Sequence, residues 1–287
     1  MPLSCSNCTF AYTPGQPVIR GVSVSLAAGR LTAIIGPNAG GKTTLLRLLA
    51  GLRRPDDGRV HFSGGAGTGT SSEEAVGDLS DAQRARRIVF VPQHSDVAFA
   101  FSTLEIVALG NVRGHAQPRG QGVRGTGESA SSVDRALAEL DLTDRADTPF
   151  VNLSAGQQQR ATLARALVQI EAWNAGNNEP RYLLADEPVS AMDPRHAVRS
   201  LALLRALATR GIGVACVLHD LALVLRFCDD AVLLQHDGTV LAAGPARETL
   251  TPDRLSALYG IEFETLRDHH GDVAAFIPHA AGLMPGS

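Results

Sequence analysis

The sequence lacks an excess of basic charge, a long apolar run and a secretory signal. Its 26 Lys and Arg are outnumbered by 29 Asp and Glu, which gives a net charge of −3, so no basic field favours nucleic-acid binding. No run of about 18 apolar residues is present, so no segment is expected to span a membrane. The N-terminus has no charged region followed by a hydrophobic core. These absences predict a soluble, intracellular protein that does not bind nucleic acid.

Cysteine is also scarce. The chain has four, and the C-x-x-C of Cys5 and Cys8 has no second pair at zinc spacing, while Cys216 and Cys228 lie in apolar surroundings. Because disulfides are rare in the cytosol, we expect reduced thiols. With 287 residues, of which 44% are apolar, the chain is long enough for one or two domains with a sizeable core.

The chain does contain a phosphate-binding motif. Residues 36–43 read G-x-x-x-x-G-K-[ST], between an apolar run expected to form a strand (31–35) and a leucine-rich stretch expected to form a helix (44–50). Glycines allow backbone N–H groups to point at phosphate oxygens, assisted by the positive end of the helix. Lys42 would reach the β- and γ-phosphates, and the Thr43 hydroxyl would bind Mg²⁺. The motif predicts an ATP site formed by Gly36, Pro37, Asn38, Ala39, Gly40, Gly41, Lys42, Thr43 and Thr44.

Two acidic residues follow a second apolar strand. "RYLLADEP" (181–188) places Asp186 at the carboxyl end of that strand, where α/β sheets present ligand-binding groups. We expect Asp186 to hold Mg²⁺ and Glu187 to polarise an attacking water. From residue 181 onward strands and helices alternate, which indicates an α/β sheet.

The first 180 residues are less regular. Residues 1–92 suggest strands with turns, apart from the helix after the phosphate loop, and residues from about 94 to 170 suggest helices. The Gly- and Ser-rich segments 63–78 and 113–132 predict flexible loops.

"LSAGQQQR" (153–160) carries the most specific information. Ser154 and Gln157 have the spacing of a capping box at a helix start. Together with the two motifs above, the segment resembles the signature motif of ABC-transporter ATPases, commonly L-S-G-G-Q. Further family motifs occur in order, and the resemblance covers residues from about 3 to 260: Tyr12 where an aromatic stacks on adenine, Gln93 of the Q-loop, Asp193 of the D-loop "SAMD" and the switch histidine His219.

The resemblance implies an α/β P-loop NTPase fold with a RecA-like core, an antiparallel β subdomain and an inserted α-helical signature subdomain. The whole chain, 1–287, would be one ABC ATPase domain. Residues 1–92 and 171–260 would form the catalytic core with the β subdomain, 93–170 the helical subdomain and 261–287 a C-terminal tail.

The resemblance also implies a mechanism that needs two chains. In a homodimer, the signature residues of one chain, Ser154, Ala155, Gly156 and Gln157, would close over ATP on the other, with Asp193 nearby. Glu187 would act as general base, His219 would contact the γ-phosphate, and Gln93 would sense Mg²⁺ and the nucleophile. The physics agrees, because a helix N-terminus at Ser154 suits an anion, and no phosphate faces it within one chain.

Two positions depart from the family pattern. The family usually reads G-P-N-G-[AS]-G-K, whereas this chain has Ala39 and then Gly40. A positive φ at Ala39 would cost about 1–2 kcal/mol, and the loop could instead shift that demand to Gly40. Ala155 replaces a signature glycine, which is tolerable if the backbone there is helical.

Among family members, the chain resembles the ATP-binding subunits of bacterial haem importers, relatives of the cobalamin and siderophore systems. The resemblance is carried by segments 91–110, 167–188 and 258–279. It implies a transmembrane permease dimer, a periplasmic substrate-binding protein reached through it, and a location on the cytoplasmic face of the inner membrane. Import of iron-siderophore or cobalamin is the alternative, and a non-transport ABC ATPase is disfavoured because no second cassette or coiled coil is present.

The segment after Gln93 suggests where a permease would bind. "HSDVAFAFSTLEIVALG" (94–110) has small and aromatic residues before a helix expected to start at Thr103, with Glu105 in its first turn. Phe99 and Phe101 are either core residues of the helical subdomain or part of a groove for a permease helix.

Overall fold

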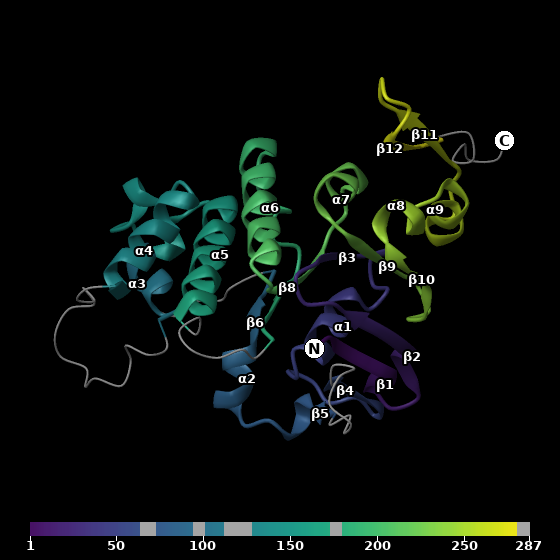
Figure 1. The fold of residues 1–287 in the computed structure, drawn as a ribbon, viewed down its shortest axis with the longest axis horizontal. Coiled ribbons are helices and arrows are strands. Elements are labelled where there is room, and N and C mark those ends of the chain that lie inside the picture. The colour runs from purple at the N-terminus through teal and green to yellow at the C-terminus, as the bar shows by residue number, and fades with distance from the viewer. Residues whose placement is uncertain (64–72, 94–100, 112–127, 173–179, 280–287) are drawn as a thin grey trace.

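The computed structural model describes residues 1–63, 73–93, 101–111, 128–172 and 180–279. At its centre lies a six-stranded sheet with the order β10-β9-β3-β8-β7-β6 (Figure 1). All five residues of β3 are buried, as expected for a central strand of a parallel sheet. The parallel strands are β3 (Leu31–Ile35), β6 (Ile88–Val91), β7 (Tyr182–Ala185), β8 (Gly213–Val217) and β9 (Asp230–Leu234), and β10 (Val240–Pro245) runs antiparallel to β9.

A second, antiparallel sheet lies beside the first and has the order β2-β1-β4-β5. Its strands are β1 (Leu3–Thr13), β2 (Gln16–Leu26), β4 (Asp57–Phe62) and β5 (Glu74–Ala75). Buried and exposed residues alternate along the second half of β2, so one face packs on the core and the other meets solvent. Helix α1 (Lys42–Leu49) follows the phosphate loop and packs against β1 and β2.

Each face of the six-stranded sheet has its own hydrophobic core. Side chains of a strand alternate between faces, so Leu31, Ala33 and Ile35 contribute to the core shared with the long helices. Ile34 points the other way, into the core shared with α1 and the antiparallel sheet. The phosphate loop leaves β3 between these two cores and is fixed from both sides.

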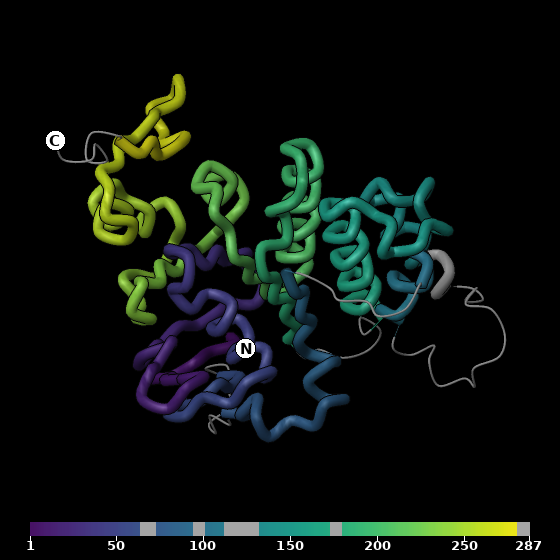
Figure 2. The backbone as a smooth tube through the Cα atoms, turned by 180° about the vertical axis from the view of Figure 1, so that it is seen from behind, coloured from purple at the N-terminus to yellow at the C-terminus, as the bar shows by residue number. Residues whose placement is uncertain are grey.

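The helical subdomain lies at one end of the molecule, away from the antiparallel sheet (Figures 1 and 2). It contains α3 (Thr103–Ala108), α4 (Glu128–Glu139) and α5 (Ala155–Ala172), with short 3-10 helices at Thr143–Arg145 and Phe150–Asn152. The expected start of α3 is confirmed by a capping box, in which the Ser102 N–H donates to Glu105 Oε2 at 2.8 Å and the Glu105 N–H donates to Ser102 Oγ at 3.2 Å.

The remaining elements complete an α/β fold of the P-loop NTPase type, as the sequence predicted. Helices α5 and α6 are long and pack into the core on one face of the central sheet. The elements not yet given are α2 (Asp81–Arg87), a 3-10 helix (Val76–Asp78), α6 (Pro194–Thr209), α7 (Leu221–Phe227), α8 (Ala246–Thr249), α9 (Pro252–Tyr259), β11 (Phe263–Arg267) and β12 (Val273–Pro278).

Three sequence expectations were wrong about local structure. Helix α2 lies within the stretch predicted to be strands and turns, where the capping pair Ser80 and Gln83 was overlooked. The predicted loop 63–78 ends in β5 and the 3-10 helix, and the predicted loop 113–132 gives way to α4. The C-terminal tail, 261–287, was given no predicted structure, and its described part contains the β11–β12 hairpin. The rest of both predicted loops, residues 64–72 and 113–127, lies outside the described residues.

Candidate nucleotide site

The phosphate loop opens onto a cavity of about 680 Å³. The loop after β3, the residues after β6, the residues after β7 and the residues after β8 all reach it, so the carboxyl ends of four parallel strands meet there. Ten of the predicted site residues line this cavity, and one further residue was not foreseen. They are Asn38, Ala39, Gly40, Gly41, Lys42, Thr43, Thr44, Gln93, Glu187 and His219, with Val18 from β2 as the addition.

Two loop glycines are required by close contact with neighbouring backbone. A Cβ on Gly36 would lie 2.1 Å from the Leu234 carbonyl oxygen. Gly41 has a φ of 87° and caps α1, and a Cβ there would lie 2.8 Å from the Val18 carbonyl oxygen. Backbone N–H groups and the N-terminus of α1 are therefore free to face a phosphate group.

The unusual order of Ala39 and Gly40 does not relocate the strained position. Ala39 has a φ of 63°, in the left-handed region, whereas Gly40 is absent from the residues with positive φ. The suggestion that Gly40 takes over this conformation is therefore wrong. The Gly40 N–H instead closes a tight turn by donating to the Pro37 carbonyl at 3.2 Å. The strain at Ala39 is on the order of 1–2 kcal/mol.

Lys42 is buried and bonded within its own loop. Its Nζ donates to the Gly36 carbonyl at 2.9 Å and to the Pro37 carbonyl at 2.7 Å. Burial lowers the pKa of Lys42, while the charges of Glu187 and Asp186 oppose that shift. These contacts hold the ammonium group beside the cavity, with the loop carbonyls in place of solvent.

Thr43 and Asp186 bring two oxygen ligands together. The Thr43 hydroxyl donates to Asp186 Oδ1 at 3.0 Å, and Asp186 is 2% exposed. Burial raises the pKa of Asp186, and the hydrogen bond from Thr43 opposes that shift. A buried carboxylate next to a hydroxyl, with the side-chain oxygen of Gln93 on the same cavity, is a donor set that fits Mg²⁺.

Glu187 lies between the two other predicted catalytic residues. Gln93 Nε2 donates to Glu187 Oε2 at 2.8 Å, and His219 Nε2 lies 2.9 Å from Glu187 Oε1. The Glu187 side chain is 19% exposed, so it is partly dehydrated but open to the cavity. The structure thus brings Gln93, Glu187 and His219 into one bonded group, although 126 positions separate the first from the last.

Tyr12 stands at the edge of the site and has an accessible ring. Its hydroxyl lies 3.3 Å from Thr44 Oγ1, and its ring meets Phe10 edge-on with centroids 4.9 Å apart. The residue is 50% exposed, and the Arg53 guanidinium lies 5.7 Å from the ring centroid. A tyrosine fixed at its hydroxyl and open on a face suits stacking against a nucleotide base.

The signature residues lie outside the cavity lining. Their predicted capping box is confirmed, because the Ser154 N–H donates to Gln157 Oε1 at 2.9 Å and the Gln157 N–H donates to Ser154 Oγ at 3.3 Å. Ser154 and Ala155 are exposed at the N-terminus of α5. None of the residues 154–157 is among the residues that line the cavity in the described part of the chain.

The two glycine positions of the signature motif play different roles. Ala155 begins the helix and is exposed, so its methyl group meets no neighbour that would exclude it. This confirms that alanine is tolerable there because the backbone is helical. At Gly156, by contrast, a Cβ would lie 2.6 Å from the Ala191 carbonyl oxygen. The second position is the one that close packing reserves for glycine.

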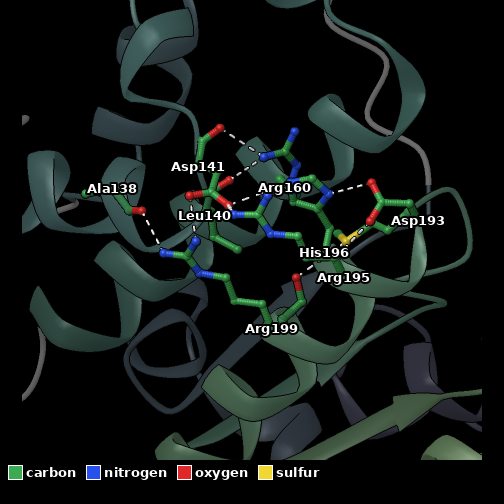
Figure 3. A network of polar contacts seen from close by, with 10 residues as sticks. Ala138, Leu140, Asp141, Arg160, Asp193, Arg195, His196 and Arg199 are labelled. Atoms are coloured by element: carbon green, nitrogen blue, oxygen red, sulfur yellow. Dashed lines mark hydrogen bonds and ion pairs between the residues drawn. The ribbon is translucent and has the colours of Figure 1, made fainter.

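Asp193 also lies away from the cavity. It caps α6, because its Oδ1 accepts from the His196 N–H at 3.1 Å, and its Oδ2 lies 2.6 Å from His196 Nδ1 (Figure 3). Burial is negligible, and the hydrogen bonds with His196 lower the pKa of Asp193. Its expected contact with a nucleotide remains a prediction for the assembled dimer.

Sequence reasoning missed a cluster of charges around Asp141 (Figure 3). Asp141 follows α4 with a φ of 51°, a position that favours glycine, and its Oδ1 accepts from Arg199 Nη1 at 2.5 Å. His196 Nε2 lies 3.7 Å and Arg195 Nη2 3.8 Å from Oδ2, while Arg160 Nη1 donates to the Asp141 carbonyl at 2.9 Å. The cluster fastens the helical subdomain to the start of α6. No local motif predicts this cluster, because Asp141, Arg160 and the segment 195–199 are far apart in sequence.

Comparison with known proteins gives a consistent result. The ABC transporter family model matches residues 19–190. The chain is 38% identical over 267 residues to the hemin import ATP-binding protein HmuV of Bordetella pertussis, covering 93% of this chain and 95% of that protein. It is 34% identical over 269 residues to the HmuV protein of Rhizobium meliloti, covering 94% and 95%.

Solved structures agree with the sequence relatives. An ABC transporter of the metal-chelate type, in an inward-facing conformation, has a TM-score of 0.73 and 27% identity, with 98% of this chain and 99% of that chain covered. The ATP-binding cassette MJ0796, a dimer in a post-hydrolysis state bound to ADP and Pi, has a TM-score of 0.67 and 26% identity, with 85% and 99% covered. Among the described residues, no helix has the length and apolar character needed to cross a membrane.

Proposed function

The chain belongs to the ABC transporter family of ATP-binding proteins, and we propose that it is the ATP-hydrolysing subunit of an importer whose substrate is haem. The observation that supports the substrate most strongly is that proteins named as hemin import ATP-binding proteins match over nearly the full length of the chain. Import of an iron-siderophore complex or of cobalamin is the second candidate, supported by the metal-chelate type transporter of similar fold.

ATP binding is assigned to the phosphate loop and Tyr12. The loop N–H groups and the N-terminus of α1 would receive the phosphates, and Lys42 would exchange its two carbonyl partners for phosphate oxygens. Tyr12 would stack on the base. Thr43, Asp186 and Gln93 would hold Mg²⁺, which neutralises charge on the β- and γ-phosphates when bound.

Hydrolysis is assigned to the group around Glu187. The carboxylate of Glu187 would accept a proton from the attacking water, acting as general base. His219 and Gln93 both contact this carboxylate, so they would orient it, and His219 would also reach the γ-phosphate. Phosphoryl transfer depends mainly on such positioning and on charge neutralisation. These side chains would supply the positioning, and Lys42 and the bound metal would supply the charge neutralisation.

A second copy of the chain would complete each site. The α5 N-terminus at Ser154 is exposed, which suits a helix end that binds an anion, and none of the residues 154–157 is among the described residues that line the cavity of the same chain. A related cassette of known structure is dimeric with bound nucleotide, which supports a two-fold arrangement here. In that arrangement residues 154–157 and Asp193 would close over the nucleotide of the partner.

A permease dimer is the expected partner on the membrane side, with this subunit on the cytoplasmic face of the bacterial inner membrane and a periplasmic substrate-binding protein on the far side of the permease. Phe101 is 38% exposed, Leu109 43% and Val151 52%, which leaves apolar surface on the helical subdomain. The Phe150 N–H donates to the Phe101 carbonyl at 2.8 Å, so Val151, the residue after Phe150, lies on backbone next to Phe101. Phe99, the other residue considered for a permease groove, lies outside the described residues.

The permease contact is tested by Phe101→Ser. We expect the variant to lose capture by the detergent-solubilised permease while its ATP affinity stays within about twofold of wild type, because the phosphate loop is not involved. Thr143→Ala, on an exposed part of the same subdomain, is the control. Joint loss of folding and ATP binding in Phe101→Ser would show that Phe101 belongs to the core instead.

The substrate is tested by growth. A bacterium lacking this chain should fail to grow with haem as its only iron source and should grow normally with ferric siderophores or, where cobalamin is required, with cobalamin. The wild-type chain should restore growth on haem, and Glu187→Gln should not. Loss of growth on a siderophore or cobalamin with normal use of haem would transfer the assignment to the second candidate.

A further inference from the structure

The turn after β7 rests directly on the first turns of α5. Gly156 and Gln159 are three residues apart on that helix and so share a face. A Cβ on Gly156 would lie 2.6 Å from the Ala191 carbonyl oxygen, so the two backbones touch without a side chain between them. Gln159 extends from the same face toward the turn that begins at Glu187.

The side-chain amide of Gln159 uses both ends on this turn. Nε2 donates to the Glu187 carbonyl at 2.9 Å and to Ser190 Oγ at 2.9 Å. Oε1 accepts from the Ala191 N–H at 3.1 Å. Gln159 is only 9% exposed, so water does not compete effectively for these bonds.

The orientation of the amide is fixed by its partners. One end faces a carbonyl oxygen, which can only accept, and the other faces a backbone N–H, which can only donate. Rotating the amide by half a turn would place oxygen against oxygen and N–H against N–H. Glutamine is thus the side chain that satisfies both ends, and a carboxylate of the same length could satisfy only one.

The backbone that Gln159 holds is conformationally strained. Glu187 has a φ of 49°, which costs a residue other than glycine on the order of 1 kcal/mol. Its carbonyl oxygen also accepts from Ser190 Oγ at 3.2 Å and from the Ser190 N–H at 3.4 Å, so three donors stabilise the bend. From this bend the carboxylate reaches Gln93 and His219 at the cavity.

We propose that Gln159 is a positioning residue for Glu187, and that it holds the strained turn from which the carboxylate meets the attacking water. The inference rests on the proposed role of Glu187 as general base. Gln159 is not among the described residues that line the cavity, and it acts through the Glu187 carbonyl and the Ala191 N–H.

This position also joins two nucleotide sites. The N-terminus of α5, one turn from Gln159, would face the ATP of the partner chain, whereas Glu187 serves the ATP of its own chain. Through Gln159, a displacement of the signature helix at one nucleotide site would therefore move Glu187, the general base of the other site. The Asp141 cluster fastens the far end of the same turn, at Asp193 and His196, to the helical subdomain (Figure 3).

The first test compares Gln159→Leu with Gln169→Leu. Gln169 lies on the same helix, and its amide bonds the Ala85 carbonyl at 3.4 Å, away from the site. For Gln159→Leu we expect kcat for ATP hydrolysis to fall at least about tenfold, with KM and ATP affinity within about twofold of wild type, because only placement of the base changes. Gln169→Leu should match wild type. A kcat for Gln159→Leu within about twofold of wild type would overturn the inference.

The second test separates positioning from general damage. In a Glu187→Gln background, Gln159→Leu should cause no further fall in the residual rate, because it acts only through Glu187. An equal fall in both backgrounds would overturn the inference. If Gln159→Leu does not fold, Gln159→Glu replaces it, since it keeps the acceptor for Ala191 and loses the donors to Glu187. A normal rate in Glu187→Gln alone would instead refute the proposed role of the base itself.

Discussion

The chain carries two unequal halves of a nucleotide site. The phosphate-loop half, residues 36–44 with Gln93, Asp186, Glu187 and His219, is assembled within one chain and its side chains are bonded to each other. The signature half, residues 154–157, is folded and capped but exposed, and it faces no part of the cavity lining. Within the described part of the chain, the cavity is lined by the phosphate-loop half together with Val18, and the signature residues do not line it.

This difference indicates how the two halves divide the work. In the phosphate-loop half Lys42 and Asp186 are buried and Glu187 is half-buried, and desolvation shifts the pKa of Lys42 downward and that of Asp186 upward. The groups of the signature half are neutral, and they offer backbone N–H groups and a hydroxyl. We therefore propose that the first half binds and reacts, and that the second half closes over what the first half of a partner chain holds.

The largest effects should come from the phosphate-loop half. Glu187→Gln should lower hydrolysis on the order of 10²–10⁴-fold, because an amide cannot accept the proton. ATP affinity, measured by titration of the isolated chain, should be retained. Near wild-type turnover in this variant would remove Glu187 from the mechanism.

Lys42→Ala should affect binding instead. Deleting a cation that faces the phosphates should weaken ATP affinity on the order of 10–100-fold. Equilibrium titration with a fluorescent ATP analogue measures this loss, and Lys42→Arg shows how much of it is due to charge alone. Unchanged affinity in Lys42→Ala would mean that the ammonium group keeps its loop-carbonyl partners when ATP is bound.

A change in the signature half should leave the isolated chain able to bind ATP. Ser154→Arg should keep ATP affinity within about twofold while abolishing hydrolysis, because the residue acts only on the partner's nucleotide. Mixed one to one, Lys42→Ala and Ser154→Arg chains form dimers of which half are mixed, and each mixed dimer has one intact site. Activity should therefore recover up to roughly a quarter of the wild-type rate. If mixed dimers form but ATP hydrolysis does not recover, the proposal that each site is shared between two chains would be contradicted.

A smaller effect is expected where the helical subdomain is fastened to α6. Asp141→Asn keeps a residue that tolerates a positive φ and removes the charge that faces Arg199, so the free energy of unfolding should fall by about 0.5–1 kcal/mol. Denaturant titration measures this change, with ATP affinity as the control that should not move. Asp141→Gly should be closer to wild type, because relief of the backbone strain offsets part of the loss.

Asp141 also makes the stability of the folded chain depend on pH, and the sign of this dependence follows from its pKa. Burial raises the pKa of Asp141, but the hydrogen bond from Arg199 and the neighbouring positive charges outweigh it, so the pKa in the folded state is lowered. The stabilisation is complete above the ordinary pKa of aspartate and is lost as the pH falls through the lowered value. The difference in the free energy of unfolding between wild type and Asp141→Asn should therefore shrink only in acid. A difference that grew on acidification would show that the carboxylate is not stabilised by these cations.

The smallest effect is expected at Ala39. Ala39→Gly removes the strain of a φ of 63° and adds the conformational freedom of glycine to the unfolded chain, for a net gain of up to about 1 kcal/mol in stability. Thermal unfolding measures the gain. Ala27→Gly, at a position without positive φ, should destabilise instead. Destabilisation by Ala39→Gly would show that the loop gains more from a restricted unfolded state than it loses to strain.

Local signals were enough to predict the framework of both halves. The apolar run of β3, the glycine loop and the start of α1 are contiguous, so their pattern specified the phosphate-binding site directly. The capping box of Ser154 and Gln157 was likewise readable within four residues.

The long-range contacts that hold the site residues in place could not be predicted in the same way. Gln159 and Glu187 are 28 positions apart, and Asp141 and Arg199 are 58 apart, so only the folded chain reveals their contacts. The positive φ of Ala39 was undecided because two neighbouring residues could have taken it. The steric role of Gly156 depends on where Ala191 lies. Sequence patterns predicted the reactive groups, and long-range packing determined what holds them.

The division between the halves is tested most directly by crosslinking one chain that carries Asn38→Cys, Ser154→Cys and Glu187→Gln. Asn38 lies on the cavity and Ser154 at the exposed end of α5, while Cys5, Cys8 and Cys216 are buried and Cys228 is half-buried. A short bis-maleimide is added with and without ATP and Mg²⁺, and the chain without added cysteines is the control. If the halves meet across a dimer, ATP should produce a species of twice the chain mass. Crosslinking confined to single chains, or a dimeric product independent of ATP, would contradict the account.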